Sequence, residues 1–212
     1  MKRHNIECVS LDLRNGDDQD VCGMRNLLLV KRLMRSNLVE AVMLAPPCSS
    51  FSLARNARPV RDNAHPRGLP GLNSEDAIKV AVGNRCLDAA VKIFKWSTLF
   101  GIPACVENPL GSHFWRVPEG AKLLDLGHVL KVHQCSFGAH YRKATKLFFN
   151  MANPELSWNL CHEKSFRCHG RHGFCSFRPG HKHEVLQGRF TTRAARYPGR
   201  LASFIARNIL QT

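Results

Sequence analysis

The sequence lacks several features that would assign it to common protein classes. No apolar run approaches the roughly 18 residues needed to cross a bilayer, so we predict no membrane span. The first residues lack the basic stretch and apolar core of a signal peptide, and the nine cysteines are odd in number. Both features argue against a secreted protein held by disulfides. We expect reduced thiols and an intracellular protein, nuclear in a eukaryote and cytoplasmic in a bacterium or phage host.

Acidic residues are also scarce. The 212 residues include 16 Asp and Glu against 31 Lys and Arg, so the formal net charge is +15, and the basic residues are spread along the chain. A basic surface gains affinity for phosphates by releasing their counterions, so this balance favours a polyanionic partner, DNA or alternatively RNA. A basic protein without such a partner is the other interpretation.

The apolar periodicity predicts helices that alternate with strands. We therefore expect an α/β protein, a three-layer sandwich with a largely parallel sheet. Residues 1–152 hold the alternating elements, 153–190 lose periodicity and accumulate Cys and His, and 191–212 form a helix that packs back on the first part. The individual predictions are strands at 6–13, 39–45 and 102–106, helices at 24–36 and 74–100, and a strand pair at 128–135 and 145–150.

Cys48 follows a predicted buried strand and two prolines, in the segment APPCSSFS at 45–52. Proline fixes its own φ and restricts the residue before it, so the thiol is held on a rigid loop. A rigid, exposed thiol near basic groups can have a depressed pKa and act as a nucleophile. Taken alone, the tripeptide PPC is more typical of an ordinary turn.

Glu107 lies just after another predicted buried strand, in CVENPLGSHFW at 105–115. Ligands of open α/β sheets bind beyond the carboxyl ends of the strands, so this topology could bring Glu107 and Cys48 to one rim. A helix cap or a surface charge is the commoner role of a glutamate in a loop.

The two segments together resemble motifs of the DNA (cytosine-5) methyltransferases, in which PPCxxFS carries the nucleophile and a short ENV-type motif carries an acid. Here ENP follows PPCxxFS after about sixty residues, and Pro109 resembles the phage-type members. The resemblance covers roughly residues 5–150 and the closing helix, and it implies a Rossmann-like methyltransferase fold. It also implies that Cys48 attacks C6 of a flipped cytosine, that Glu107 interacts at N3, and that Asn108 braces the carboxyl.

The same resemblance implies further contacts with the nucleic acid. The segment FGAHYRKATKLFFN at 137–150 would bring Arg142 and Lys143 to the target base or its phosphates, with a basic hairpin tip as the alternative. Ser52 would also contact the substrate. The loop at 53–72 is predicted to form a lid, with a mobile linker as the alternative. Its arginines would clamp the flanking phosphates: Arg55, Arg58, Arg61 and Arg67.

The methyl donor implied by the resemblance is S-adenosylmethionine, but the Gly-rich turn that holds it in the family is missing from the sequence. Asp12 stands where the ribose-binding acid is expected, Asp20 where an acid meets the adenine, and Pro46 is the third predicted donor contact. A lone Asp after a strand is more often a turn or a helix cap. We interpret the sequence as an N-terminally truncated copy, a fragment of a longer polypeptide, with a degenerate copy that binds without turnover as the alternative.

Cysteine and histidine gather in the 23 residues that end at His183. Three thiolates and one imidazole are a common structural zinc set, and this polar segment has little apolar surface to fold around without a metal. His181 and His183 would face opposite sides of an extended chain, so only one should bind, and the surroundings of His183 resemble the subfamily. The predicted ligands are Cys161, Cys168, Cys175 and His183. Reduced loop cysteines are the alternative.

The leading hypothesis is therefore an S-adenosylmethionine-dependent DNA cytosine-5 methyltransferase, or a fragment of one. A catalytically inactive nucleic-acid-binding protein on the same fold, with a zinc module, is the first alternative. A cysteine-nucleophile enzyme of another kind, such as an RNA methyltransferase, is the second.

Overall fold

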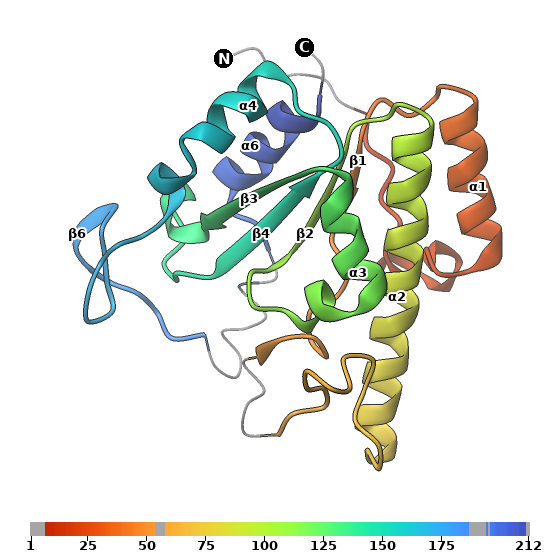
Figure 1. Ribbon diagram of the computed structural model, residues 1–212, viewed down its shortest axis with the longest axis horizontal. Helices are drawn as coiled ribbons and strands as arrows, with labels where there is room; N and C mark the ends of the chain where they lie inside the picture. The colour runs from red at the N-terminus through yellow and green to blue at the C-terminus, as the bar shows by residue number, and fades with distance from the viewer. Residues whose placement is uncertain (1–6, 54–57, 187–193, 195, 211–212) are drawn as a thin grey trace.

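The structure is a computed structural model that describes residues 7–53, 58–186, 194 and 196–210 (Figure 1). Its centre is a four-stranded sheet with the strand order β1-β2-β4-β3. The strands are β1 (Val42–Leu44), β2 (Ala104–Pro109), β3 (His128–His133) and β4 (Ala144–Phe149).

The sheet is mixed, so the prediction of a largely parallel sheet is wrong. β1 and β2 are parallel, because the long helix between them allows a crossover connection. β4 is antiparallel to both β2 and β3, and β3 turns into β4 through the short connection at 134–143. The strand pair predicted at 128–150 is confirmed as an antiparallel hairpin, and this hairpin supplies half of the sheet.

Five α-helices are found in the described residues. The helix predicted at 74–100 is confirmed. Asn73 is its N-cap residue, and the side chain of Asn73 accepts a hydrogen bond from the backbone N–H of Asp76 at 2.9 Å. None of the helices in the described part of the chain has the length and apolar character needed to cross a bilayer. The helices are α1 (Met24–Arg35), α2 (Ser74–Leu99), α3 (Pro118–Leu123), α4 (Pro154–Cys161) and α6 (Gly199–Ile209).

The strand predicted at 6–13 is wrong for the described residues 7–13. These residues form no strand, and a 3-10 turn, Leu13–Asn15, begins at their end. Val9 and Leu13 are 77% and 49% exposed, so the apolar alternation that suggested a strand has no core to face. Further 3-10 turns occur at Asp17–Gln19, His113–Arg116, Leu124–Leu126, Gln134–Phe137 and Glu163–Phe166.

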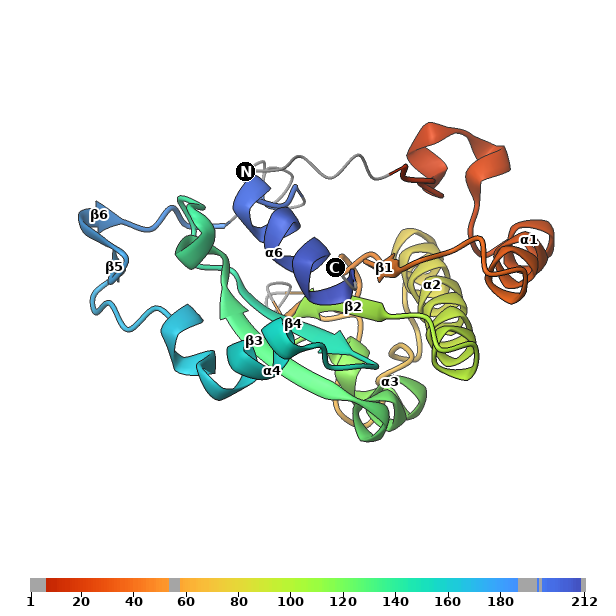
Figure 2. The ribbon, with the colours of Figure 1, turned by 90° about the horizontal axis from the view of Figure 1, so that it is seen from above.

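Helices cover both faces of the sheet. Val106 of β2 packs against α2 and α3 in one apolar cluster, whereas its neighbour Cys105 packs against α4 and α6 in another. This follows from the alternation of side chains along a strand. Figure 2 shows α6 on one side of the sheet and α3 on the other. The predicted return of the C-terminal helix is confirmed, since α6 buries Leu201, Phe204 and Ile205 in the second cluster.

The Cys/His-rich segment ends in a small two-stranded antiparallel sheet of β5 (Phe174–Cys175) and β6 (Arg178–Lys182). In Figure 1 it projects at one end of the molecule beyond β3. The backbone at Gly170 packs closely against the backbone of β5, because a Cβ at Gly170 would lie only 1.8 Å from the carbonyl oxygen of Phe174. Glycine is therefore required at this position.

Candidate functional site

Cys48 and Glu107 lie at the same end of two neighbouring parallel strands. Leu44, the last residue of β1, pairs with Val106, the residue before Glu107. The loop that leaves β1 turns at once, since the carbonyl of Cys48 accepts hydrogen bonds from the backbone N–H groups of Phe51 and Ser52 at 3.0 and 2.8 Å. The Cys48 side chain is half-buried. The sequence-predicted pair thus meets at one end of the sheet, although its chemistry is untested.

Asn108 fastens this end of β2 to the Cys48 loop. Its side chain is fully buried, and its Nδ2 donates a hydrogen bond to the carbonyl of Pro46 at 3.0 Å. This contact differs from the predicted one, in which Asn108 would brace the carboxyl of Glu107. Asn108 therefore positions the rigid PPC loop relative to β2.

Glu107 is a buried acid whose two carboxyl oxygens differ in their hydrogen bonding. It is 5% exposed, and the hydroxyl of Tyr197 donates a hydrogen bond to its Oε2 at 2.8 Å. The Lys143 Nζ lies 3.8 Å from Oε1, which has no hydrogen-bond partner among the described residues. Burial raises the pKa of Glu107, whereas Lys143 and Tyr197 oppose that increase. This carboxyl therefore keeps its proton to a higher pH than an exposed glutamate.

The thiol of Cys48 does not have the depressed pKa that a nucleophile beside basic groups could show. Burial raises the pKa of Cys48. The positive charge of Lys143 lowers it, and the negative charge of Glu107 raises it. Lys143 is therefore the cation that favours the thiolate of Cys48 and the carboxylate of Glu107 alike.

The other predicted substrate contacts lie in different surroundings. Arg142 is exposed, and its Nε lies 3.3 Å from Nδ1 of His133, away from the Glu107 carboxyl that its neighbour Lys143 approaches. Ser52 is half-buried in the Cys48 turn. Arg55 lies outside the described residues. The structure thus brings Lys143 to the Cys48 and Glu107 pair, whereas Arg142 contacts His133.

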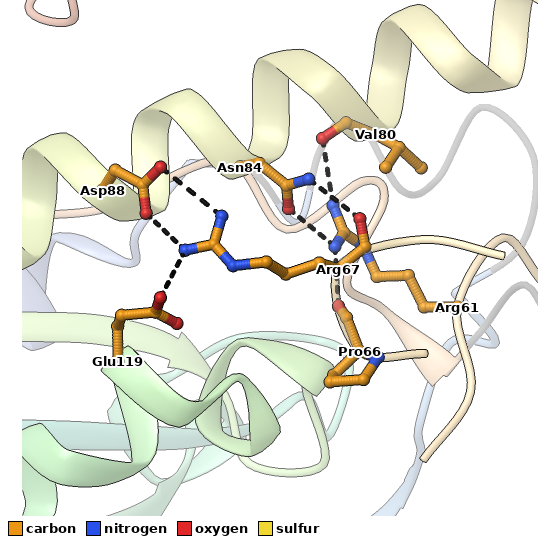
Figure 3. Close-up of polar contacts among 7 residues, drawn as sticks. All are labelled: Arg61, Pro66, Arg67, Val80, Asn84, Asp88 and Glu119. Atoms are coloured by element: carbon orange, nitrogen blue, oxygen red, sulfur yellow. Dashed lines mark hydrogen bonds and ion pairs between the residues drawn. The ribbon is translucent and has the colours of Figure 1, made fainter. Parts of the chain in front are cut away.

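Arg61 does not clamp phosphates, and that prediction is wrong. Its residue is only 2% exposed, and its guanidinium lies 3.9 Å from the centre of the Phe51 ring. Burial lowers the pKa of Arg61 to about 10, so the group stays charged at neutral pH. Its hydrogen bonds run to Ser50 O and Oγ (both 3.0 Å), Pro66 O (2.7 Å), Asn84 Oδ1 (2.9 Å) and Val80 O (3.1 Å). Figure 3 shows those to Pro66, Asn84 and Val80.

Arg67 is also engaged within the protein. Its Nη2 lies 2.6 Å from Asp88 Oδ1 on α2 and 2.9 Å from Glu119 Oε1 on α3 (Figure 3). Its carbonyl accepts a hydrogen bond from Asn84 at 2.8 Å. Arg58, 74% exposed in its side chain, pairs with Asp76 at 3.5 Å. Residues 58–72 are therefore fastened to α2, which contradicts the prediction of a lid for this part of the loop.

The predicted donor contacts find no support. The carboxylate of Asp20 accepts a hydrogen bond from the Cys22 N–H and pairs with Arg85 of α2, both at 2.9 Å. Asp20 thus has the alternative role of a turn residue before α1. Asp12 is exposed, and the strand that was to end at it is absent. The carbonyl of Pro46 already accepts from Asn108. These residues do not fit a site for S-adenosylmethionine.

A second site is formed by Cys135, Cys168, Cys175 and His183, whose ligand atoms all lie within 4.8 Å of one another. The three cysteines are buried. A tetrahedral zinc ion with Zn–S bonds of about 2.3 Å and Zn–N bonds of about 2.0 Å holds a sulfur and a nitrogen ligand roughly 3.5 Å apart. The Cys168 Sγ and the His183 Nε2 are 3.8 Å apart, so this Cys3His group could hold a metal such as zinc.

The surroundings of Cys168 favour a thiolate, the form that binds metals. Its sulfur accepts hydrogen bonds from the backbone N–H and the hydroxyl of Ser176 at 3.3 and 3.5 Å. Burial raises the pKa of Cys168, but hydrogen bonds, first among them those from Ser176, bring it down to about 7. The backbone N–H of Cys168 donates to Nδ1 of His133 at 2.8 Å, which ties this loop to the end of β3.

One predicted ligand is wrong and another was missed. Cys161 is exposed at the end of α4 and does not belong to the group, because the helix carries it away from the other thiols. Cys135 takes its place from the turn after β3. Its signal was a cysteine at the end of the strand predicted at 128–135, outside the Cys/His-rich segment at 153–190. The predicted Cys168, Cys175 and His183 are confirmed as members of the group.

Comparison of the chain with protein-family models, with curated proteins and with solved structures found no match in any of the three. The functional interpretation therefore depends on the residues of this chain and their geometry.

Proposed function

We propose that the chain is the catalytic region of a DNA cytosine-5 methyltransferase on a Rossmann-like methyltransferase fold, with Cys48 as the nucleophile and Glu107 as the acid. The observation that carries the proposal is a half-buried thiol and a buried, proton-retaining carboxyl at the same end of two neighbouring parallel strands, both acted on by the ammonium of Lys143. The sequence motifs PPCxxFS and ENP supply the same two residues.

The chemistry that these residues support is activation of the cytosine ring. The thiolate sulfur of Cys48 forms a bond to C6, and the C5–C6 π electrons move through the ring towards N3. N3 takes a proton from Glu107, which becomes a carboxylate, and the product is an enamine with a nucleophilic C5. In the reverse direction the carboxylate recovers the proton from N3, the C5–C6 double bond forms again and the thiolate leaves.

The electrostatics of the site suit the acid better than the nucleophile. The raised pKa of Glu107 keeps a proton available for N3. The raised pKa of Cys48 means that little thiolate is present in the free protein, and Lys143 is the group that counters this effect. Because a base inside a duplex hides its ring face, the cytosine must be flipped out or single-stranded.

The structural part of the proposal includes zinc in the Cys3His group. Cys135 comes from the end of β3, whereas the other three ligands come from the Cys/His-rich segment. Zinc bound there would join that segment to the sheet and would stabilise a part of the chain with little apolar surface. Its role is structural, and no step at Cys48 depends on it.

The proposal is tested with DNA that carries 2-pyrimidinone in place of the target cytosine, in the absence of a methyl donor. This ring lacks the electron-donating amino group, so its C6 accepts a thiolate readily. We expect a covalent adduct, detected as a mass increase of the intact protein, that Cys48→Ser abolishes and Glu107→Gln slows. Cys161→Ser, which changes an exposed cysteine, is the matched control. An adduct of equal yield with Cys48→Ser would remove the assignment.

Two further arms separate the alternatives. RNA with the same base analogue tests for an RNA methyltransferase, since faster adduct formation on RNA than on DNA would favour that enzyme. DNA with 5-fluorocytosine and S-adenosylmethionine tests methyl transfer itself, because fluorine at C5 prevents release of the methylated base.

A catalytically inactive nucleic-acid-binding protein is the second candidate, and one observation favours it. Asp20 and Pro46, two of the predicted donor contacts, are engaged in contacts within the protein. Such a protein would bind DNA, form no adduct and show no calorimetric signal with S-adenosylmethionine.

A further inference from the structure

We propose that Tyr197 is a positioning residue for Glu107, and that its hydroxyl decides which carboxyl oxygen faces the substrate base. The inference rests on the proposed function of Glu107 as an acid. Tyr197 lies 90 residues further along the chain and just before α6, outside every motif considered in the sequence.

The hydrogen bonds of Glu107 are unequal on its two oxygens. Oε2 accepts the hydroxyl hydrogen of Tyr197 at 2.8 Å, so this oxygen acts as the carbonyl-like acceptor when the acid is protonated. Oε1 is buried and has no hydrogen-bond partner among the described residues. A buried polar atom without a partner is costly, so an orphaned atom of this kind at a site is expected to find its partner in a ligand.

Lys143 is not the hydrogen-bond partner of Oε1. Its Nζ lies 3.8 Å from Oε1, beyond hydrogen-bonding distance, and donates a hydrogen bond to the carbonyl of Ala194 at 3.1 Å. Tyr197 therefore leaves Oε1 as the oxygen that carries the proton and presents it to a ring nitrogen with a free lone pair. N3 of a flipped cytosine is such an acceptor.

The Tyr197 ring is held firmly enough to orient another side chain. It packs against the apolar cluster that α6 forms with the sheet. Pro198 follows it as the N-cap residue of α6 and restricts the backbone of Tyr197 to extended conformations. The closing helix thus delivers a hydroxyl to the end of β2.

The charged and titratable groups that act on Glu107 from the elements around it are Cys48, Cys105, Lys143 and Tyr197. Burial and the negative charge of Glu107 raise the pKa of Tyr197, so the phenol keeps its hydrogen and can only donate to Oε2. That donation stabilises the carboxylate and lowers the pKa of Glu107. Loss of the hydroxyl must therefore raise the pKa of Glu107 further.

The experiment compares Tyr197→Phe with Tyr141→Phe, which removes the hydroxyl of the only other tyrosine. The first readout is the rate of adduct formation with the 2-pyrimidinone duplex. We expect about a tenfold loss for Tyr197→Phe and a much smaller loss for Tyr141→Phe, whose hydroxyl donates at 3.4 Å to the carbonyl of Arg196 and not to Glu107. The second readout is the pKa of Glu107, followed by NMR of 13C-labelled glutamate carboxyls and assigned by the signal missing in Glu107→Gln. We expect it to rise only in Tyr197→Phe.

The outcomes separate this inference from the proposed function. An unchanged rate together with an unchanged Glu107 pKa in Tyr197→Phe would overturn the positioning role. If the wild-type protein forms no adduct, the proposed function fails, and the carboxyl titration still reports whether the hydroxyl controls Glu107. A fall in rate without a change in the Glu107 pKa would assign Tyr197 a packing role and also overturn the inference.

Discussion

Lys143 acts on two side chains that need opposite proton states. Its positive charge lowers the pKa of Cys48, which favours the nucleophile, and it also lowers the pKa of Glu107, which works against the acid. Burial has the larger effect on both groups and raises both pKa values. A site of this composition keeps an acid proton, and in the part of the chain that the structure describes Lys143 is the cation that favours its thiolate.

The two neighbours of Cys48 should therefore shift its titration in opposite directions. Lys143→Met removes the positive charge and raises the pKa of Cys48, so alkylation of this thiol by iodoacetamide needs a higher pH. Glu107→Gln removes the negative charge and lowers the pKa, so alkylation is faster at a given pH. Peptide mass spectrometry across a pH series measures the rate at Cys48 alone. Shifts of the same sign in both variants would contradict this electrostatic account.

At the scale of elements, two segments without regular structure are fixed by specific side chains. Residues 58–72 are held on α2 through Arg61 and Arg67. Arg61 also donates to the carbonyl of Ser50, two residues beyond Cys48, so the turn that follows the nucleophile is anchored to the same helix.

Arg61→Met should destabilise the protein by about 3 kcal/mol, because several buried acceptors lose a charged donor at once. Arg58→Met is the matched control in the same loop, and we expect a change below about 0.5 kcal/mol because that side chain is 74% exposed. Urea unfolding followed by circular dichroism gives both free energies. Equal effects of the two substitutions would show that the buried hydrogen bonds of Arg61 contribute little.

Zinc content distinguishes the metal group of the structure from the one expected from the sequence. The wild-type protein should bind one zinc ion per chain, and Cys135→Ser should lose it, together with stability against heat. Cys161→Ser should keep the metal, since its thiol is exposed on α4 and outside the group. Metal analysis by inductively coupled plasma mass spectrometry checks both. Loss of zinc in Cys161→Ser alone would refute the assignment of Cys135.

At the scale of the whole molecule, the net charge of +15 is the property that bears on partners. Two of the cations are not open to a partner, since Arg61 is buried and Arg67 is paired with two carboxylates. The charge that remains exposed is still large, and it is available for phosphates.

Binding to a DNA duplex should therefore weaken steeply with salt. If about three phosphates are neutralised, affinity should fall more than tenfold between 50 and 200 mM salt, because fewer counterions are released. Fluorescence anisotropy with a labelled duplex measures the slope. Glu107→Gln should leave the slope unchanged, since that carboxyl is buried. An affinity independent of salt would mean that the basic surface is not the binding surface.

Local patterns in the sequence were sufficient for much of the fold. Helical spacing predicted α1 and α2, and short apolar runs predicted β1 and β2, because these elements bury the faces that their periodicity marks. The strand ends then placed Cys48 and Glu107 at one end of the sheet. The set of three thiols and one imidazole was also readable, since composition alone indicates it.

Only the tertiary structure decided which residues meet across long stretches of chain. It replaced Cys161 with Cys135 in the metal group, because ligands converge in space and not by spacing along the sequence. It buried Arg61, whose partners come from three separate parts of the chain. It also set the hydroxyl of Tyr197 against Glu107, a contact that depends on how α6 packs on the sheet. Periodicity carries no information on such contacts, because they depend on the folded core.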